Sequence, residues 1–192
     1  KLVVIERGID PAQFPRDALV DADTRAQWQA EFPALAGGFV LLMPGRGTRL
    51  KGHHAAIGLL AALRAQGLDA RLWLLGTRDA GREAYVAELE QRAASLGVAG
   101  QIAISAPRGD IARAYAMSDL VLQLSERPEA FGRTVLEALA VGKPVLGWDH
   151  GGVGEQLRAH YPSGAVATAD TDALVATALR LARPPVPPVP IL

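Results

Sequence analysis

The sequence lacks cysteine, surplus charge and long apolar runs. No cysteine occurs among its 192 residues, which excludes a disulfide framework and a thiolate metal site and suits a cytosolic protein. Twenty basic side chains balance twenty acidic ones, so no overall field attracts nucleic acid or an anionic membrane. No apolar run reaches the roughly 20 residues of a membrane span. We expect a soluble protein that binds anions only in a local pocket and has no nucleic-acid partner.

Length and composition predict one main domain. With 49% hydrophobic residues, the chain can bury a sizeable core, which we place in residues 1–183. Residues 184–192 form a proline-rich tail, expected to be extended and weakly ordered. The abrupt strand-like opening at Leu2–Ile5 and this tail suggest a piece of a longer protein.

Apolar runs alternate with segments of helical period along most of the chain. Strands are predicted at Phe39–Met43, Ala70–Leu75, Gln101–Ser105, Leu120–Leu124, Pro144–Trp148 and Ala165–Ala167. Helices are predicted near His53–Gln66, Arg82–Leu96, Ile111–Met117, Arg133–Val141, Val153–Ala159 and Thr171–Ala182. Several strands are apolar at nearly every position, which is typical of a parallel sheet covered on both faces. The pattern predicts an α/β fold, a Rossmann-like open parallel sheet that binds ligands at the carboxyl ends of its strands.

The loop Pro44–Gly52 follows the first of the long buried strands and is rich in glycine and basic residues. It fails the dinucleotide fingerprint, because Leu50 stands where the third glycine belongs, and it lacks the lysine and hydroxyl residue of a phosphate loop. Arg46 and Lys51 remain, and their guanidinium and ammonium groups are suited to two phosphate oxygens. The alternative is that both are solvated loop charges.

Two glutamates, Glu129 and Glu137, surround an Ala-Phe-Gly turn that leads into a helix. Free N–H groups at a helix N-terminus favour phosphate or sugar hydroxyls. Glu137, inside the helix, is placed to accept the paired hydroxyls of a ribose, and Glu129 lies nearer a transferred group. Alternatively, Glu129 compensates the helix dipole and Glu137 faces solvent.

Weaker signals occur elsewhere. Pro107 and Arg108 follow a strand where a nucleobase could lie flat against backbone and side chain. The segment His150–Glu155 opens another helix with two glycines, although a tight turn explains it equally. Asp21 and Asp23 resemble an Asp-x-Asp metal motif, but a helix N-cap is the simpler interpretation. The adjacent His53 and His54 point to different helix faces. We therefore predict no metal site.

These segments together resemble the C-terminal, donor-binding half of a retaining glycosyltransferase with the GT-B fold, and are most similar to glycosyltransferase family 4 (group 1). The resemblance rests on the segments ERGIDPAQFP, GRGTRLKG and SERPEAFGRTVLEALAVGKPVLGWDHGGVGE, the last of which is similar to the family's Glu-x7-Glu signature. The sequence departs from the family pattern at Glu6-Arg7, which replaces Pro-Asn, and at Ala106-Pro107, where a glycine is usual.

The resemblance implies a role for each candidate residue. Arg46 and Lys51 would bind the donor diphosphate without a metal or another cofactor. Glu129 would act at the transferred sugar as the catalytic-site carboxylate, and Glu137 would bind the ribose. The remaining implied contacts are to sugar hydroxyls from Phe131, Gly132 and Arg133, to phosphates from Thr134 and Val135, and to the base from Pro107 and Arg108.

The resemblance also implies partners. A nucleoside diphosphate sugar of UDP- or GDP-hexose type would donate to a saccharide or lipid acceptor. An N-terminal acceptor domain, absent from this chain, would supply the acceptor site and a histidine near the reacting carbon, so the chain alone would bind donor without catalysing transfer. Richness in alanine, arginine and glycine hints at a bacterial source and at envelope polysaccharide or lipopolysaccharide synthesis. The expected location is cytoplasmic, with peripheral attachment to the inner face of the membrane as an option.

Three other functions remain open at this point. A nucleotide-sugar epimerase or a sugar phosphorylase could use the same two-domain fold, and the phosphorylase would need a lysine to anchor pyridoxal phosphate. A non-enzymatic nucleotide-sugar binding module would account equally well for the composition.

Overall fold

The computed structural model describes residues 8–16 and 20–191. The strand-like opening at Leu2–Ile5 and the Glu6-Arg7 departure lie outside the described residues. Within them, six strands alternate with seven α-helices and several short 3-10 turns. This alternation confirms the predicted α/β architecture.

All the strands pair in parallel in one sheet. They are β1 (Phe39–Pro44), β2 (Ala70–Leu75), β3 (Ile102–Ser105), β4 (Leu120–Gln123), β5 (Val145–Trp148) and β6 (Ala165–Val166). The strand order is β3-β2-β1-β4-β5-β6. The chain therefore runs outward from β1 to β3, returns to the centre at β4, and runs outward again to β6. This is the predicted Rossmann-like sheet, and its topology changes direction between β1 and β4.

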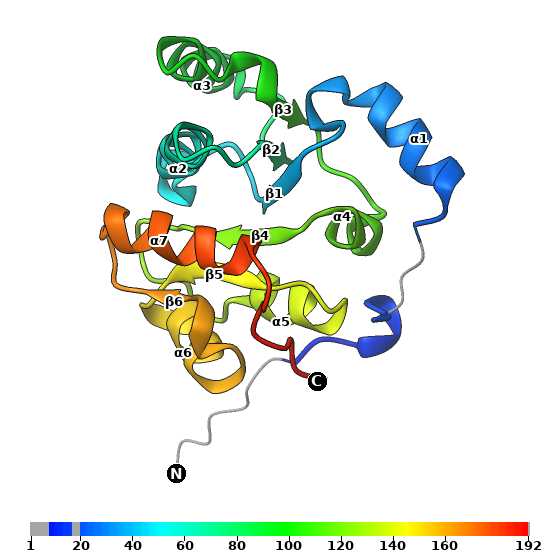
Figure 1. Cartoon of the computed structure of the whole chain (residues 1–192), viewed down its shortest axis with the longest axis vertical. Coiled ribbons are helices and arrows are strands. Elements are labelled where there is room, and N and C mark those ends of the chain that lie inside the picture. The colour runs from blue at the N-terminus through cyan, green and yellow to red at the C-terminus, as the bar shows by residue number, and fades with distance from the viewer. Residues whose placement is uncertain (1–7, 17–19, 192) are drawn as a thin grey trace.

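Helices cover both faces of the sheet. They are α1 (Ala22–Glu31), α2 (His53–Ala65), α3 (Glu83–Ser95), α4 (Ile111–Met117), α5 (Arg133–Ala140), α6 (Gly151–His160) and α7 (Thr171–Ala182). In Figure 1, α2, α3 and α7 lie to one side of the strands, and α1 and α4 to the other. Helix α2 packs against α7, and helix α5 packs against α6. Helices α2 to α7 were predicted from the sequence, and their observed ends differ from the predicted ones by at most two residues.

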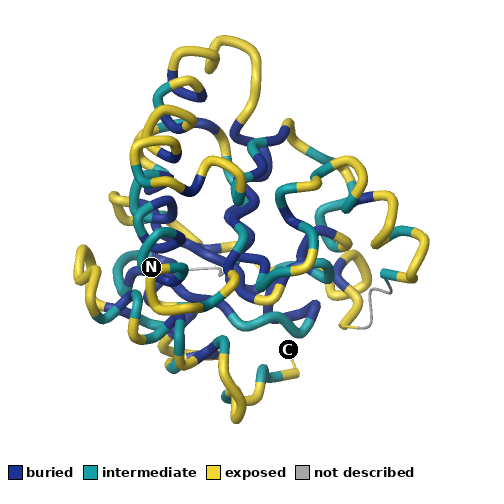
Figure 2. The backbone as a smooth tube through the Cα atoms, turned by 45° about the horizontal axis from the view of Figure 1, so that its top comes forward, coloured by how far each residue is buried: buried dark blue, intermediate teal, exposed yellow. Residues whose placement is uncertain are grey.

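The core is built by the strands and the helix faces that cover them. Figure 2 shows the central strands as the most continuous buried part of the backbone. Leu41, Leu42, Leu72 and Leu74 have no solvent exposure, as their uniformly apolar sequence predicts. Burying each such side chain contributes about 1.5 to 3 kcal/mol before the entropy cost of ordering it.

Helix α1 begins at the Asp-x-Asp motif. The Oδ1 atom of Asp21 accepts a hydrogen bond from the amide of Thr24 at 2.7 Å, so the capping interpretation is confirmed. The helix is mostly polar and buries only Trp28, whose ring meets that of Trp73 edge-on at a centroid distance of 5.3 Å. This single aromatic contact anchors α1 over the sheet.

Residues 186–191 of the proline-rich tail form no helix or strand, and the tail is not detached from the domain. Arg16 donates hydrogen bonds to the carbonyl oxygens of Pro190 at 2.7 Å and Val189 at 2.8 Å. Val189 also packs against the hydrophobic core, and the hydroxyl of Tyr161 donates to the carbonyl of Pro187 at 3.3 Å. In Figure 1 the tail lies beside the described N-terminal residues. The tail is therefore better attached than the sequence indicated.

None of the described helices has both the length and the apolar character needed to cross a membrane.

Candidate functional site

The change of direction between β1 and β4 brings two loops together at the carboxyl edge of the sheet. The amide of Glu126 donates to the carbonyl of Leu50 at 2.8 Å. Gly52 has a φ of 81° and lies against Leu124, whose carbonyl oxygen a Cβ at position 52 would overlap. Only glycine combines this left-handed backbone with so close an approach. The loop after β1 and the loop after β4 are therefore fixed against each other.

This contact places Lys51 beside Glu129. The Nζ atom of Lys51 lies 2.5 Å from Oε1 of Glu129, and both side chains are about a quarter exposed. The hydroxyl of Ser125, which is almost fully buried, donates to the same Oε1 atom. Glu129 is thus oriented by a cation and a hydroxyl group.

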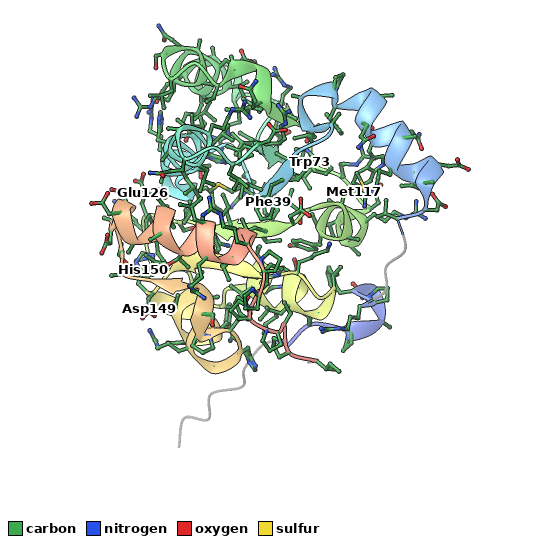
Figure 3. The ribbon with its side chains drawn as sticks, in the orientation of Figure 1. Phe39, Trp73, Met117, Glu126, Asp149 and His150 are labelled. Atoms are coloured by element: carbon green, nitrogen blue, oxygen red, sulfur yellow. The ribbon has the colours of Figure 1, made fainter. Side chains whose placement is uncertain are left out.

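The start of α6 supports the loop that carries Glu129. The amide of Gly152 donates to the carbonyl of Glu129 at 2.7 Å, and Nε2 of His150 lies 2.8 Å from the carbonyl oxygen of Ser125. The two glycines predicted to open this helix therefore serve close backbone contact. Figure 3 shows Glu126 and His150 on one side of the domain, away from Trp73 and Met117.

The N-terminus of α5 lies directly beyond this loop. Gly132 has a φ of 64°, and a Cβ there would come within 2.9 Å of Gly152 and Val153. Within the described chain, the first-turn amides of Arg133 and Thr134 donate no backbone hydrogen bond. The amide of Val135 already donates to Gly132 at 2.9 Å. Arg133 and Thr134, rather than Val135, therefore present N–H groups suited to an anion.

Glu137 lies one turn into α5 and has two partners. Its Oε2 atom accepts a hydrogen bond from the hydroxyl of Tyr115 at 2.8 Å, and its Oε1 atom lies 3.2 Å from Arg133. Burial of Tyr115, followed by the nearby Glu137 charge, raises the pKa of the Tyr115 hydroxyl well above its ordinary value. Tyr115 therefore remains a donor and holds one oxygen of Glu137 in place. The Glu137 side chain is 13% exposed, so it is not the solvent-facing residue of the alternative interpretation.

Arg46 stands apart from the other cation of its loop. It is exposed, and its guanidinium makes no hydrogen bond or ion pair with the described residues. It borders a cavity of about 210 Å³ at the carboxyl ends of β1 and β2. Leu75, Pro107 and Ile111 form apolar walls of this cavity, and Arg108 completes its border. Pro107 and Arg46 thus face one hollow, although they are far apart in sequence.

Arg108 is held more firmly than the sequence indicated. It donates to Asp110 at 2.9 and 3.2 Å and to Glu31 at 2.9 and 3.0 Å. Its guanidinium carbon lies 4.6 Å from the centre of the Trp28 ring. The hydrogen bond from Arg108 lowers the pKa of the Asp110 carboxyl. Helix α1, which supplies Trp28 and Glu31, was not predicted to take part in the site.

The adjacent histidines serve different networks. His53 is fully buried, with Nδ1 at 3.2 Å from the Tyr85 hydroxyl and Nε2 at 3.1 Å from that of Thr77. Desolvation lowers the pKa of His53 to about 4, so the ring is neutral near pH 7. His54 instead contacts Glu88 at 2.8 Å. Among the described residues no group of three or more His, Cys, Asp or Glu could hold a metal ion.

The structure brings most of the candidate residues to one edge of the sheet. The missed residues, Tyr115 and Ser125, both contact the glutamates. A hydroxyl-bearing residue on the otherwise mostly apolar helix α4 was a signal for Tyr115, but its partner lies 22 positions away. Another cavity, of about 140 Å³, lies beside Trp28 and Asp119 at the opposite edge of the sheet, and none of the candidate residues borders it.

The fold and the site together define a class of protein. The strand order of this open parallel sheet reverses between β1 and β4, as in Rossmann-like domains. A lysine, a carboxylate and a helix N-terminus lie at that point, and this arrangement suits an anionic ligand. Residues 24–183 match the family of glycosyl transferases group 1. The chain belongs to this family, and it has the fold of a C-terminal GT-B-type glycosyltransferase domain.

Similar proteins agree with this assignment. A D-inositol 3-phosphate glycosyltransferase of Jonesia denitrificans is 32% identical over 169 residues, which cover 85% of this chain and 39% of that protein. A glycosyltransferase structure from Rickettsia africae has a TM-score of 0.78 at 26% identity and covers 92% of this chain and 45% of its own. Anabaena HepE, solved in complex with UDP and glucose, has a TM-score of 0.77 at 28% identity and covers 92% and 46%. This chain spans less than half the length of each.

Proposed function

We propose that this chain is the donor-binding domain of a glycosyltransferase that uses a nucleoside diphosphate sugar, with UDP or GDP as the nucleotide and a hexose as the sugar. In the full enzyme the sugar passes, with retention at the anomeric carbon, to a saccharide or lipid acceptor held by a second domain. The location of the full enzyme is proposed to be the cytoplasm, with envelope polysaccharide or lipopolysaccharide synthesis as its setting.

The proposal rests on the order in which the candidate residues lie along the carboxyl edge of the sheet, which we call the rim. Lys51 and the α5 N-terminus lie at the change of sheet direction, Glu137 follows within α5, and Tyr115 links Glu137 to α4. Ile111, one turn before Tyr115, borders the apolar cavity that contains Pro107. A nucleoside diphosphate sugar requires the same sequence of contacts: anion site, hydroxyl acceptor, and a flat apolar hollow for the base.

The basic groups are proposed to serve the departing diphosphate. In the transfer, the bond between the anomeric carbon and the β-phosphate oxygen breaks, and a bond to the acceptor oxygen forms. The acceptor proton leaves with the diphosphate. Lys51, Arg46 and the amides of Arg133 and Thr134 would stabilise the developing negative charge, which is the role that a metal ion has in other phosphate chemistry. No metal or other cofactor is therefore proposed.

Glu129 is proposed to bind the transferred sugar. Lys51 and Ser125 both contact its Oε1 atom, and Oε2 accepts no hydrogen bond and makes no ion pair within the described residues. Oε2 is thus the oxygen placed to accept a sugar hydroxyl. The backbone at Phe131, Gly132 and Arg133 would bind further hydroxyls, because Gly132 has no side chain to block a ligand.

Family membership favours transfer over the alternatives. A phosphorylase would need a lysine that anchors pyridoxal phosphate, and an epimerase would convert a nucleotide sugar without an acceptor. HepE, which shares this fold, was solved with UDP and glucose, and this supports a nucleotide sugar as the ligand here.

Calorimetric titration of the 192-residue chain with UDP, GDP and ADP tests the proposal. At least one nucleotide should bind, and the Arg46→Ala, Lys51→Ala double variant should bind it about 30-fold or more weakly, because two charge-assisted contacts to phosphate are removed. Arg49→Gln is the matched control, since Arg49 belongs to the same loop but pairs with Glu88. Equal affinity in the double variant would reject the assigned phosphate contacts, and absence of binding by all three nucleotides would reject the donor site.

A further inference from the structure

The most unusual side chain outside the phosphate contacts is Arg108. Each of its three guanidinium nitrogens donates to a carboxylate, Nε and one terminal nitrogen to Asp110 and the other to Glu31. These bonds lie close to the guanidinium plane, because that is where its N–H groups point. The edges that face Asp110 and Glu31 are therefore occupied, and these two chain segments fix the orientation of the group.

One face of this fixed plane is also covered. The guanidinium carbon lies 4.6 Å from the centre of the Trp28 ring, a distance typical of a cation stacked on an aromatic face. Trp28 is itself buried and held edge-on against Trp73. The stack therefore rests on the hydrophobic core.

Arg108 also borders a cavity. Together with Pro107 it borders the cavity of about 210 Å³ whose walls include Leu75 and Ile111. Arg46, the proposed diphosphate ligand, borders the same cavity. A planar group that enters it would meet apolar side chains, the proline ring and Arg108, and it would lie beside Arg46.

We propose that Trp28 and Glu31 of α1 are positioning residues for base recognition, which act by holding Arg108 as a flat stacking platform for the nucleobase of the donor. This inference rests on the proposed function and deepens it. Because most of its N–H donors bond Asp110 and Glu31, the guanidinium contributes mainly stacking and charge rather than hydrogen bonds to the base edge. The platform therefore increases the affinity for a ligand that has a nucleobase over one that lacks it. It discriminates only weakly between uracil, adenine and guanine.

The platform also accounts for the presence of Ala106-Pro107 at the place where the family usually has a glycine. A glycine would give the loop backbone freedom to approach a base closely. Pro107 removes an N–H donor and fixes its own φ angle, which directs recognition from backbone contacts toward a rigid stacking surface. Helix α1 then supplies the rigidity that the loop backbone alone does not.

The test compares a ligand that has a base with one that lacks it. UDP and inorganic pyrophosphate are titrated separately against the unaltered chain, Glu31→Gln and Arg108→Lys. Glu31→Gln keeps the side-chain size and weakens the hold on Arg108, whereas Arg108→Lys keeps the charge and removes the plane. UDP affinity should fall about 5-fold in Glu31→Gln and about 10-fold in Arg108→Lys, with pyrophosphate affinity unchanged within about 2-fold. ADP and GDP should lose the same factor as UDP.

Glu90→Gln is the matched control, because Glu90 is another exposed glutamate paired with an arginine, Arg78, at 2.7 Å, and it should change neither titration. Equal losses for UDP and pyrophosphate would overturn the inference, since Glu31 would then act through general fold damage. Unchanged UDP affinity in both variants would overturn it as well, as would a loss confined to one base. If the unaltered chain bound neither UDP, ADP, GDP nor pyrophosphate, the proposed function itself would fail.

Discussion

On one side of the rim, the loops around Lys51 and Glu129 approach each other so closely that Gly52, Gly132 and Gly152 leave no room for a Cβ atom. On the other side, the loop that carries Arg108 is held to α1 by side-chain ion pairs and a stacked tryptophan. We call the first the glutamate side (residues 44–53 and 125–137, with 150–154) and the second the arginine side (residues 105–111, with Trp28 and Glu31).

The two sides differ in what a substitution would change. Backbone contacts on the glutamate side fix positions to within the small tolerance of close packing, which suits groups that must act on a reacting bond. Ion pairs at the surface contribute little to stability, so the ion pairs of the arginine side can be changed without loss of the fold, whereas Trp28 belongs to the core. We infer that the glutamate side, where the sugar would react, tolerates little change in position. The arginine side, where the base would bind, tolerates more.

The largest expected effect is on the glutamate side, in Gly52→Ala. The added Cβ would overlap the carbonyl oxygen of Leu124 and would require a left-handed alanine, since φ is 81°. The free energy of unfolding in urea should fall by about 3 kcal/mol or more.

Gly67→Ala separates the two causes of this loss. Gly67 has the same φ of 81° but no atom within 4 Å of the added Cβ, so it should cost only about 1 kcal/mol. Equal losses in the two variants would show that close approach at Gly52 contributes nothing, and the comparison between the two sides would fail.

The second prediction concerns acid and the buried His53, which begins α2 directly after Gly52. Its pKa is lowered to about 4 in the folded protein from 6.5, so the unfolded chain binds the additional proton. Its contribution to stability is therefore complete above about pH 6.5 and is lost as pH falls toward 4, by about 3 kcal/mol.

The measurement is the unfolding free energy of the chain and of His53→Gln between pH 7 and pH 4. The variant has no ring to protonate, so its stability should fall less steeply over this interval. Parallel slopes would contradict the buried, neutral state of His53.

The third prediction is that Tyr115→Phe weakens ribose recognition. The change removes the donor that holds Oε2 of Glu137, and UDP affinity should fall about 5-fold while pyrophosphate affinity stays the same. Stability should fall by about 1 kcal/mol, as for loss of one buried hydrogen bond. Tyr161→Phe, in which the lost bond is to Pro187 at 3.3 Å, controls for removal of a buried hydroxyl distant from the rim. A matching loss of pyrophosphate affinity in Tyr115→Phe would argue against a ribose-specific role.

The smallest expected effect is on the stability of the arginine side. Glu31→Gln removes an ion pair whose glutamate side chain is 46% exposed, so the unfolding free energy should change by less than about 1 kcal/mol. A loss comparable with that of Gly52→Ala would show that both sides depend equally on fixed contacts. Urea unfolding of both variants in the same buffer makes this comparison direct.

Much of the fold was predictable because its signals are local. Runs such as those around Leu41 and Leu72 are apolar at nearly every position, and this pattern is typical of buried parallel strands. The loops at the carboxyl ends of the strands follow from it, so Lys51, Glu129 and Glu137 could be assigned to one rim before any geometry was known.

The remaining details depend on contacts between distant segments, which no local pattern records. Tyr115 meets Glu137 across two helices, and Arg108 meets Glu31 from a helix that lies 77 positions earlier in the chain. The bond from the Val135 amide to Gly132 depends on how the first turn of α5 closes. Which charges pair, and which remain available to a ligand, was therefore beyond sequence reasoning.

A crystal structure of the chain with UDP bound tests the central claim most directly. The account predicts diphosphate oxygens within hydrogen-bond distance of Lys51 and the α5 N-terminus, ribose hydroxyls on Glu137, and the base in the cavity bordered by Pro107 and Arg108. A diphosphate bound away from Lys51, or a ribose that leaves Glu137 uncontacted, would contradict it.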